Sequence, residues 1–334
     1  MTISRLLATH ERESLYTGAN YAIWNSHHLA GRLSKSTARE EDFVATLVTD
    51  GIPLLAERWG PLLHSKGVAL KLSGVFCHGH PQVSFGSPPS RVELADLLIV
   101  HQHTKATRVS ARAMLLQAKM SSDSTHRLSP SDPQLQLFSK WPLFEFVTGG
   151  LPAGFRDLKE VGKGSRYALV LNKPAYPEEI TWADQCPWVA SPAVQHLTAD
   201  RSLARVLGDM LLHKDGRPFQ TGKPKDDWSK TIQDLLQITG QRTYRRANIK
   251  RGHTPRLAHL LGNSVGLMLM CEHVTPPASR AKSLSQTSVI DRYFGVIPTM
   301  QEGGHELDPP RREQNVPPDG GISTLIIETT ALDG

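Results

Sequence analysis

The sequence has few cysteines and no long apolar run, and both absences narrow the class of protein. Its 334 residues include Cys77, Cys186 and Cys271, an odd number that cannot close a disulfide set, and no CxxC pair for a structural zinc. No stretch reaches the apolar length of a membrane helix, and the N-terminus lacks the apolar region of a secretory signal. We therefore expect a soluble protein of a reducing compartment, most simply the cytoplasm, with no membrane partner.

Complete motifs for several enzyme classes are also missing. Residues 162–165 read Gly-Lys-Gly-Ser without the upstream glycine of a phosphate-binding loop, so ATP use has no support. Residues 77–80 read Cys-His-Gly-His without a second half at zinc-finger spacing, which favours a turn. Residues 262–266 match G-x-S-x-G, but the segment before them reads as a helix where a nucleophile elbow needs a strand. A serine hydrolase using Ser264 is therefore the weakest alternative.

The charge balance is basic and unevenly distributed. The net charge is +6, and residues 301–334 carry seven acids against two bases, so residues 1–300 carry +11. A basic body favours a polyanionic partner. Five bases and one aromatic residue cluster in residues 242–251. The candidate phosphate-binding residues there are Arg242, Tyr244, Arg245, Arg246, Lys250 and Arg251. A solvated basic face is the alternative interpretation of this segment.

Hydrophobic periodicity divides the chain into four regions. Residues 1–35 form an N-terminal extension, and residues 36–172 alternate helix, strand, strand, strand, helix and strand, the pattern of an α/β domain. Residues 173–300 are expected to be mainly helical and of unknown role. Residues 301–334 form an acidic tail rich in proline and glycine that ends in a strand. We expect a central mixed sheet flanked by helices.

Local signals place the individual elements. Thr37 and Glu40 have the spacing of a capping box at the start of a helix, and Pro53 predicts a break near residues 51–53. Asp132 followed by proline predicts another helix start. Strands are predicted over residues 68–76, 82–85, 93–100, 112–120, 166–172 and 322–328, the last returning to a sheet edge, and helices over residues 202–212 and 228–238. His101 and His103, at the end of a strand, are expected at the surface.

Polar side chains interrupt two of the apolar strands. Asp96 lies in one, and Gln117 and Lys119 lie two residues apart in the next, so the latter two share a face. An amide and an ammonium in a buried run are costly unless they are paired or used. Oxygens of Asp96, Gln117 and the Ala118 carbonyl would suit Mg²⁺ or Mn²⁺, and Lys119 would orient a water and offset transition-state charge. The pattern therefore favours metal-assisted phosphodiester hydrolysis, with an Asp96–Lys119 salt bridge as the structural alternative.

At these residues the sequence resembles the PD-(D/E)XK nuclease superfamily, whose core is restriction-endonuclease-like. Asp96 matches its first acid and Lys119 its lysine. The resemblance covers about residues 36–172 and implies a glutamate on the helix before the sheet, for which Glu41 is preferred to Glu40. Some branches carry a glutamine on the helix after the motif, where Gln134 and Gln136 lie.

The resemblance implies a Mg²⁺-dependent or Mn²⁺-dependent DNA endonuclease that serves restriction, phage defence or repair. It further implies that a partner subunit of a defence system or a homodimer could complete the enzyme. Two departures matter: Ala95 replaces a proline, and Gln117 replaces the second acid, as in the Mrr-like branch. A neutral ligand lowers the charge available to the metal. The alternative is a catalytically inactive module on the same fold that binds nucleic acid or protein.

Overall fold

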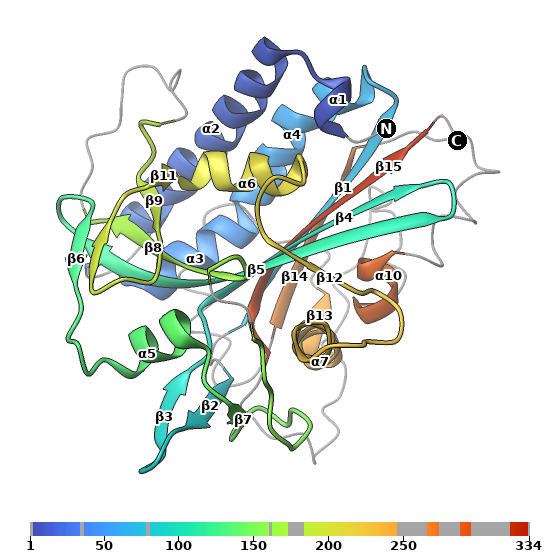
Figure 1. The fold of residues 1–334 in the computed structure, drawn as a ribbon. Helices are drawn as coiled ribbons and strands as arrows, with labels where there is room; N and C mark the ends of the chain where they lie inside the picture. Colours follow the sequence, from blue (N-terminus) through green and yellow to red (C-terminus); the bar gives the residue numbers. More distant parts are fainter. Residues whose placement is uncertain are drawn as a thin grey trace.

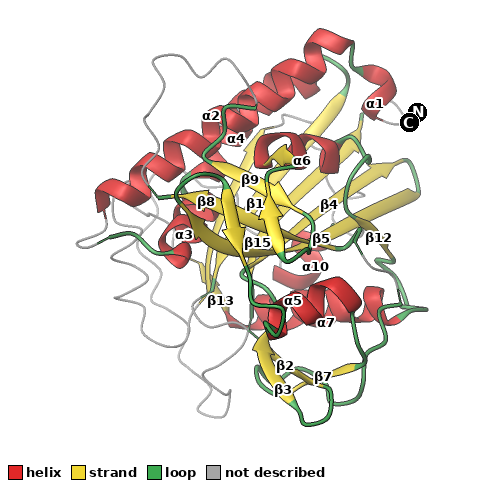
Figure 2. Ribbon diagram, turned by 60° about the vertical axis from the view of Figure 1, so that its left-hand side comes forward, coloured by secondary structure: helices red, strands yellow, loops and turns green. Residues whose placement is uncertain are grey.

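The computed structural model describes residues 3–33, 37–77, 81–159, 162–172, 184–245, 266–273, 288–294 and 321–332; the side chains of residues 242–245 and 266–273 are not among the described groups. These residues form a mixed α/β structure in which helices cover both faces of a large sheet (Figures 1 and 2). This confirms the expected central mixed sheet flanked by helices. Within these ranges, no helix combines the length and apolar character needed to cross a membrane.

Four helices precede the sheet. They are α1 (Ile3–Leu6), α2 (Thr9–Leu33), α3 (Glu40–Thr49) and α4 (Gly51–His64). The capping box predicted at Thr37 is wrong, because α3 begins at Glu40 and Asp42 Oδ2 accepts from the Arg39 backbone N–H at 3.0 Å. The break predicted near residues 51–53 is confirmed, since α3 ends at Thr49 and α4 begins at Gly51.

The central sheet joins strands from every part of the chain. Its members are β1 (Val68–Phe76), β4 (Leu97–Lys105), β5 (Arg108–Ser121), β8 (Ser165–Leu171), β9 (Trp188–Ser191), β11 (Arg201–Ser202), β12 (Arg217–Phe219), β13 (Thr243–Arg245), β14 (Gly266–His273) and β15 (Ser323–Ala331). The order is β11-β9-β8-β5-β4-β15-β1-β14-β13, with β12 paired to β5. β4 and β5 form an antiparallel hairpin, and β8 pairs parallel to β5.

The C-terminal strand lies inside this sheet. β15 runs parallel to β4 and antiparallel to β1, so the predicted return to a sheet edge is wrong. Its side chains explain the position: Leu325 and Ile327 are buried on one face of the sheet and Ile326 on the other. A strand that is apolar on both faces is stable only where both faces are covered.

Smaller sheets and further helices surround this core. The small sheets are β3-β2-β7, formed by β2 (Gln82–Phe85), β3 (Ser90–Glu93) and β7 (Phe144–Phe146), and β10-β6, formed by β6 (Thr125–Arg127) and β10 (His196–Thr198). The remaining helices are α5 (Pro133–Lys140), α6 (Leu203–Leu211), α7 (Asp227–Arg242) and α10 (Val289–Phe294). The predicted strand over residues 93–100 is therefore divided, since β3 ends at Glu93 and β4 begins at Leu97. Residues 173–300 are not mainly helical where they are described, because this part of the chain contains the strands β9 to β14 as well as the helices α6, α7 and α10.

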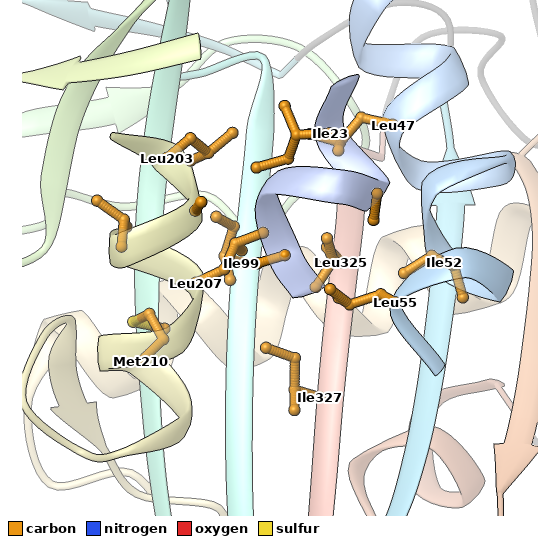
Figure 3. Close-up of a cluster of buried hydrophobic side chains, with 14 of the residues drawn as sticks. Ile23, Leu47, Ile52, Leu55, Ile99, Leu203, Leu207, Met210, Leu325 and Ile327 are labelled. Carbon is orange, nitrogen blue, oxygen red and sulfur yellow. The ribbon is translucent and has the colours of Figure 1, made fainter. Parts of the chain in front are cut away.

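Alternation along the strands builds one hydrophobic cluster on each face. Ile99 and Leu116 face a cluster with side chains of α2, α3, α4 and α6, which Figure 3 shows around Ile23 and Leu207. Leu98 and Leu115 face the second cluster, which contains side chains of α5, α7 and α10. We call these the α2 face and the α5 face of the sheet. Helix α2, within the predicted N-terminal extension, shares its cluster with the helices that follow it.

One close contact fixes α3 against the sheet. Gly74 of β1 is directly below the end of α3, and a Cβ added there would lie 1.7 Å from the Val48 carbonyl oxygen. Only glycine permits this approach.

We expect Gly74→Ala to destabilise the fold by about 3 kcal/mol, because backbone must move to admit the methyl group. Gly31→Ala on α2 is the matched control. No atom lies within 4 Å of the position that its Cβ would take, and a helical alanine should stabilise by about 0.5–1 kcal/mol. Urea unfolding of both variants measures the difference; equal stability would contradict the contact.

Candidate functional site at the end of β5

The predicted residues Asp96, Gln117 and Ala118 meet where β5 runs past the beginning of β4. The Asp96 backbone N–H donates to the Leu116 carbonyl at 2.9 Å and ends the ladder between the two strands. Beyond that point, the Asp96 carboxylate accepts the backbone hydrogen bond that a neighbouring strand would otherwise accept. Its Oδ2 accepts from the Ala118 backbone N–H at 2.6 Å and from the Gln117 side-chain Nε2. Asp96 thus lies in the connection one residue before β4, whereas the sequence predicted it inside a strand.

A second carboxylate binds the same edge of β5 one repeat further on. Glu40, the first residue of α3, accepts from the Met120 backbone N–H through Oε1 at 3.2 Å. Glu41, the preferred glutamate in the sequence, pairs instead with Arg39 at 2.8 Å. The sequence could not choose between the two, because the helix start that decides which one contacts β5 was predicted two residues too early.

The predicted lysine lies on the same face as Gln117. Residues 113, 115 and 117 of β5 alternate onto the α5 face, so Lys119 follows them there. Lys119 is half-buried, and its side chain makes no hydrogen bond or ion pair with the described residues. The alternative of an Asp96–Lys119 salt bridge is therefore not what the structure shows.

The side chain of Gln117 is buried, and its amide oxygen has no hydrogen-bond partner among the described residues. Its side chain is 4% exposed, its Nε2 is used by Asp96, and its Oε1 has no hydrogen-bond partner within the described residues. A buried acceptor without a donor costs free energy. The position therefore suits a bound water or a cation.

The donor set at this edge is made of oxygens. Because the N–H and C=O of one strand residue point to the same side, the Ala118 carbonyl faces the edge where Asp96 binds. The carboxylates of Asp96 and Glu40, that carbonyl and the Gln117 amide oxygen fit the preference of Mg²⁺ or Mn²⁺ for hard ligands. In the described part of the chain, no three histidine, cysteine, aspartate or glutamate side chains form a metal cluster. A cation here would depend on the amide and backbone oxygens.

Helix α5 covers the α5 face beside this edge. Asp132 Oδ1 accepts from the Leu135 backbone N–H at 2.9 Å and caps the helix, as predicted. Gln134 is buried, at 8% exposure, and Gln136 is half-buried. Neither side chain has a hydrogen bond that ties it to Asp96 or Gln117. A role of either glutamine at the site stays a prediction.

The predicted basic segment lies elsewhere in the sheet. β13 carries the backbone of residues 243–245 and is separated from β4 by β15, β1 and β14, which is about 19 Å at the usual strand spacing. The side chains of Arg242, Tyr244 and Arg245 lie outside the described groups, as do Arg246, Lys250 and Arg251 entirely. Phosphate binding by this segment stays a prediction.

Two other sequence motifs, Cys-His-Gly-His at residues 77–80 and G-x-S-x-G at residues 262–266, lie largely outside the described residues. Ser264 and residues 78–80 lie outside the described residues. After Gly266 the chain forms the strand β14, whereas a nucleophile elbow requires a helix there. The serine hydrolase alternative is therefore contradicted by the element that follows its motif.

The structure also reveals a buried histidine cluster on the α2 face. His101 and His103 are 0% and 8% exposed, so the surface position expected for them is wrong. His101 Nδ1 donates to the Met210 carbonyl at 2.9 Å, its Nε2 lies 2.9 Å from the Thr329 hydroxyl, and its ring is 4.7 Å from that of His213. Sequence could not show this, because the partners come from α6 and β15.

No protein-family model, no curated protein and no solved structure matches this chain. Functional assignment therefore rests on the geometry described above and on the motif in the sequence.

The histidine cluster predicts that the fold loses stability in mild acid. Burial, followed by the charges of Arg112 and His103, lowers the pKa of His213 to about 4, and burial holds the pKa of His101 well below its usual range. The unfolded chain binds these protons near pH 6.5, whereas the folded chain does not. The contribution of these two histidines to the free energy of unfolding should be fully present above pH 7. It should be lost as the pH drops from about 6.5 toward 4.

Thermal unfolding between pH 7.5 and 4.5 measures this dependence. His213→Asn should reduce the slope, because asparagine tolerates the left-handed backbone at this position (φ 61°) and does not titrate. A slope that is the same in both proteins would show that His213 is not one of the responsible groups.

Proposed function

We propose that this chain is a metal-dependent nuclease that hydrolyses phosphodiester bonds, most simply in DNA, on a restriction-endonuclease-like core. The observation that carries the proposal is the meeting of Asp96, Gln117 and Ala118 at one edge of β5, with Lys119 on the adjoining face. These are the residues that the motif names, and they come from the connection before β4 and from β5. A salt bridge to Asp96 would have occupied the Lys119 ammonium. Without that salt bridge, the ammonium can bind a ligand.

The order and pairing of the elements support the same core. Apart from α4 and the small-sheet strands β2, β3, β6 and β7, the elements from α3 to β8 come in the order helix, strand, strand, strand, helix, strand; they are α3, β1, β4, β5, α5 and β8. β5 is central to the site, with β4 antiparallel on one side and β8 parallel on the other. The acid thus reaches β5 from the β4 side, and α5 closes the face on which Gln117 and Lys119 lie.

Each residue has a defined role in such a reaction. Bound Mg²⁺ or Mn²⁺ would polarise the phosphate and lower the pKa of a water. Asp96 holds its carboxylate at the edge of β5 through the Ala118 N–H, and Gln117 packs against it as a neutral neighbour. The Lys119 ammonium orients the attacking water and offsets the negative charge that develops on the phosphate. Glu40 is the second acid that the structure places on β5.

The substrate class follows from charge. Residues 1–300 carry a net +11, which attracts a polyanion and makes binding dependent on salt. Three further parts of this proposal come from the motif resemblance alone: service in restriction, phage defence or repair, a partner subunit, and a homodimer. Action in the cytoplasm is proposed from the cysteine content and the lack of long apolar runs.

One observation favours a second function, a binding module without catalysis. Asp96 Oδ2 already accepts two N–H groups, and Gln117 turns its amide nitrogen rather than its oxygen toward the acid. An acid that caps a strand edge can be purely structural. Such a protein would bind nucleic acid or another protein with no need for a metal.

Removal of the lysine separates chemistry from fold. We expect Lys119→Ala to lower Mg²⁺-dependent or Mn²⁺-dependent plasmid cleavage by about 100-fold or more, because a positioned charge at the reacting phosphate is lost. Lys214→Ala is the matched control: it removes an exposed lysine after α6, whose neighbour Asp215 contacts β5 at Arg112, seven residues along the strand from Lys119, and it should leave cleavage unchanged.

Plasmid nicking on agarose gels, with EDTA as the blank, measures all three proteins. Equal cleavage by the wild type and Lys119→Ala would end the catalytic assignment of Lys119. Absence of cleavage in the wild type under every metal would favour the binding module.

Gln117→Glu tests whether residue 117 faces a cation. The new carboxylate would lie against Asp96, so without metal the pair repels and Tm falls. If Gln117 is a ligand, millimolar Mg²⁺ or Mn²⁺ should restore Tm by several degrees and preserve or raise cleavage. A binding module predicts a variant that stays destabilised and inert with metal, while both forms still shift DNA in a salt-dependent way.

A further inference from the structure

Two buried polar atoms without partners belong to neighbouring residues of β5 and β8 beside the candidate site. Gln117 of β5 is the register partner of Tyr167 of β8 in the parallel ladder. The side chains of both residues lie on the α5 face. Paired strands are about 4.8 Å apart. Gln117 Oε1 and the Tyr167 hydroxyl each have no hydrogen-bond partner in the described structure, and the side chains are 4% and 0% exposed.

Packing fixes the tyrosine ring. Phe138 of α5 lies against it at 5.6 Å between ring centroids. Burial and the nearby charge of Asp132 raise the pKa of Tyr167 well above its usual range. The phenol is therefore protonated and can donate a hydrogen bond. Asp132 itself is engaged as the cap of α5, through the Leu135 backbone N–H.

The two atoms are complementary, since one is an acceptor and the other a donor. They are not joined directly, and a buried group left unsatisfied is costly. An occupant that satisfies both must accept from Tyr167 and donate to Gln117. A cation fails the first condition because it cannot accept a hydrogen bond, and the lack of exposure of Tyr167 excludes a large ligand. The Gln117 oxygen has two lone pairs, so an occupant shared with Tyr167 leaves one of them for a cation at the edge of β5. Water meets both conditions and is the common solution in protein interiors.

We infer that the Tyr167 hydroxyl and the Gln117 amide oxygen bind one buried water molecule between β5 and β8, and that Tyr167 is a positioning residue of the candidate site. Through this water, β8 and α5 hold the orientation of the Gln117 amide, whose other end donates to Asp96. The chain Tyr167, water, Gln117, Asp96 then connects the α5 face to the edge of β5. The positioning role rests on the proposed nuclease function, whereas the water does not.

A double-mutant cycle tests the shared water through stability. Tyr167→Phe and Gln117→Met each remove one partner while keeping most of the volume. Each should lower Tm, and the double variant should fall no further than the worse single variant, a coupling of about 2 °C or more. Tyr16→Phe is the matched control, since its hydroxyl donates to Asp209 at 2.7 Å, far along the chain from Gln117. Its effect should add to that of Gln117→Met.

Additive shifts for Tyr167→Phe, or a rise in Tm when its hydroxyl is removed, would overturn the shared water. Kinetics test the positioning role. Tyr167→Phe should lower kcat for metal-dependent cleavage by about ten- to a hundredfold with little change in KM for DNA, because the substrate contacts remain while Gln117 is free to turn.

The outcomes separate this inference from the function it builds on. If the wild type cleaves DNA and Tyr167→Phe retains its kcat, the positioning role is wrong and the nuclease stands. If the wild type cleaves nothing with any metal, the positioning role falls with the nuclease, and the Tm cycle alone decides the water.

Discussion

The end of β5 needs hydrogen-bond acceptors that no neighbouring strand supplies. β5 continues past the first residue of β4, so the N–H groups of Ala118 and Met120 face an edge without a ladder partner. Unpaired backbone donors in a buried setting are costly, and here carboxylates of Asp96 and Glu40 accept them. The same constraint brings two acids and the outward carbonyl of Ala118 to one edge. The candidate site is thus a consequence of unequal strand lengths.

The rest of the molecule keeps this edge in place. β15, from the far end of the sequence, lies between β1 and β4 and fixes the position from which Asp96 enters. Gly74 lets α3 approach β1 closely, which sets where Glu40 at the start of that helix can reach. On the other side, β8 pairs with β5 and places Tyr167 beside Gln117, and α5 packs against Tyr167 through Phe138. The two hydrophobic clusters therefore bear directly on the geometry of the polar residues between them.

Local patterns in the sequence predicted the elements that depend on neighbouring residues. The strand at residues 68–76 and the Asp132 cap of α5 were found because alternation and capping are local signals. Pairings between distant segments were not predictable in this way. Nothing near Tyr167 indicates that it registers with Gln117, and nothing near Ile326 indicates that its strand lies inside the sheet. Helix α2 was missed because polar residues such as Asn20 are buried among its apolar ones, which obscures the periodicity.

The candidate site shows the same division. Asp96, Gln117 and Lys119 were predicted from the i, i+2 rule and the cost of burying polar groups, and the structure brings the first two into contact. The choice between Glu40 and Glu41 depended on the helix start, where the N-cap is Arg39 and its backbone N–H donates to Asp42. The register with β8, which adds Tyr167, is set by packing across the sheet and leaves no local trace.

Binding of Mn²⁺, followed by the loss of its free electron paramagnetic resonance signal, tests the central claim most directly. Asp96→Asn keeps the shape of the side chain and removes the charge. If the oxygens at the edge of β5 form a cation site, the wild type should bind Mn²⁺ and Asp96→Asn should bind it at least tenfold more weakly. Equal binding by the two proteins, or no binding by the wild type, would contradict it.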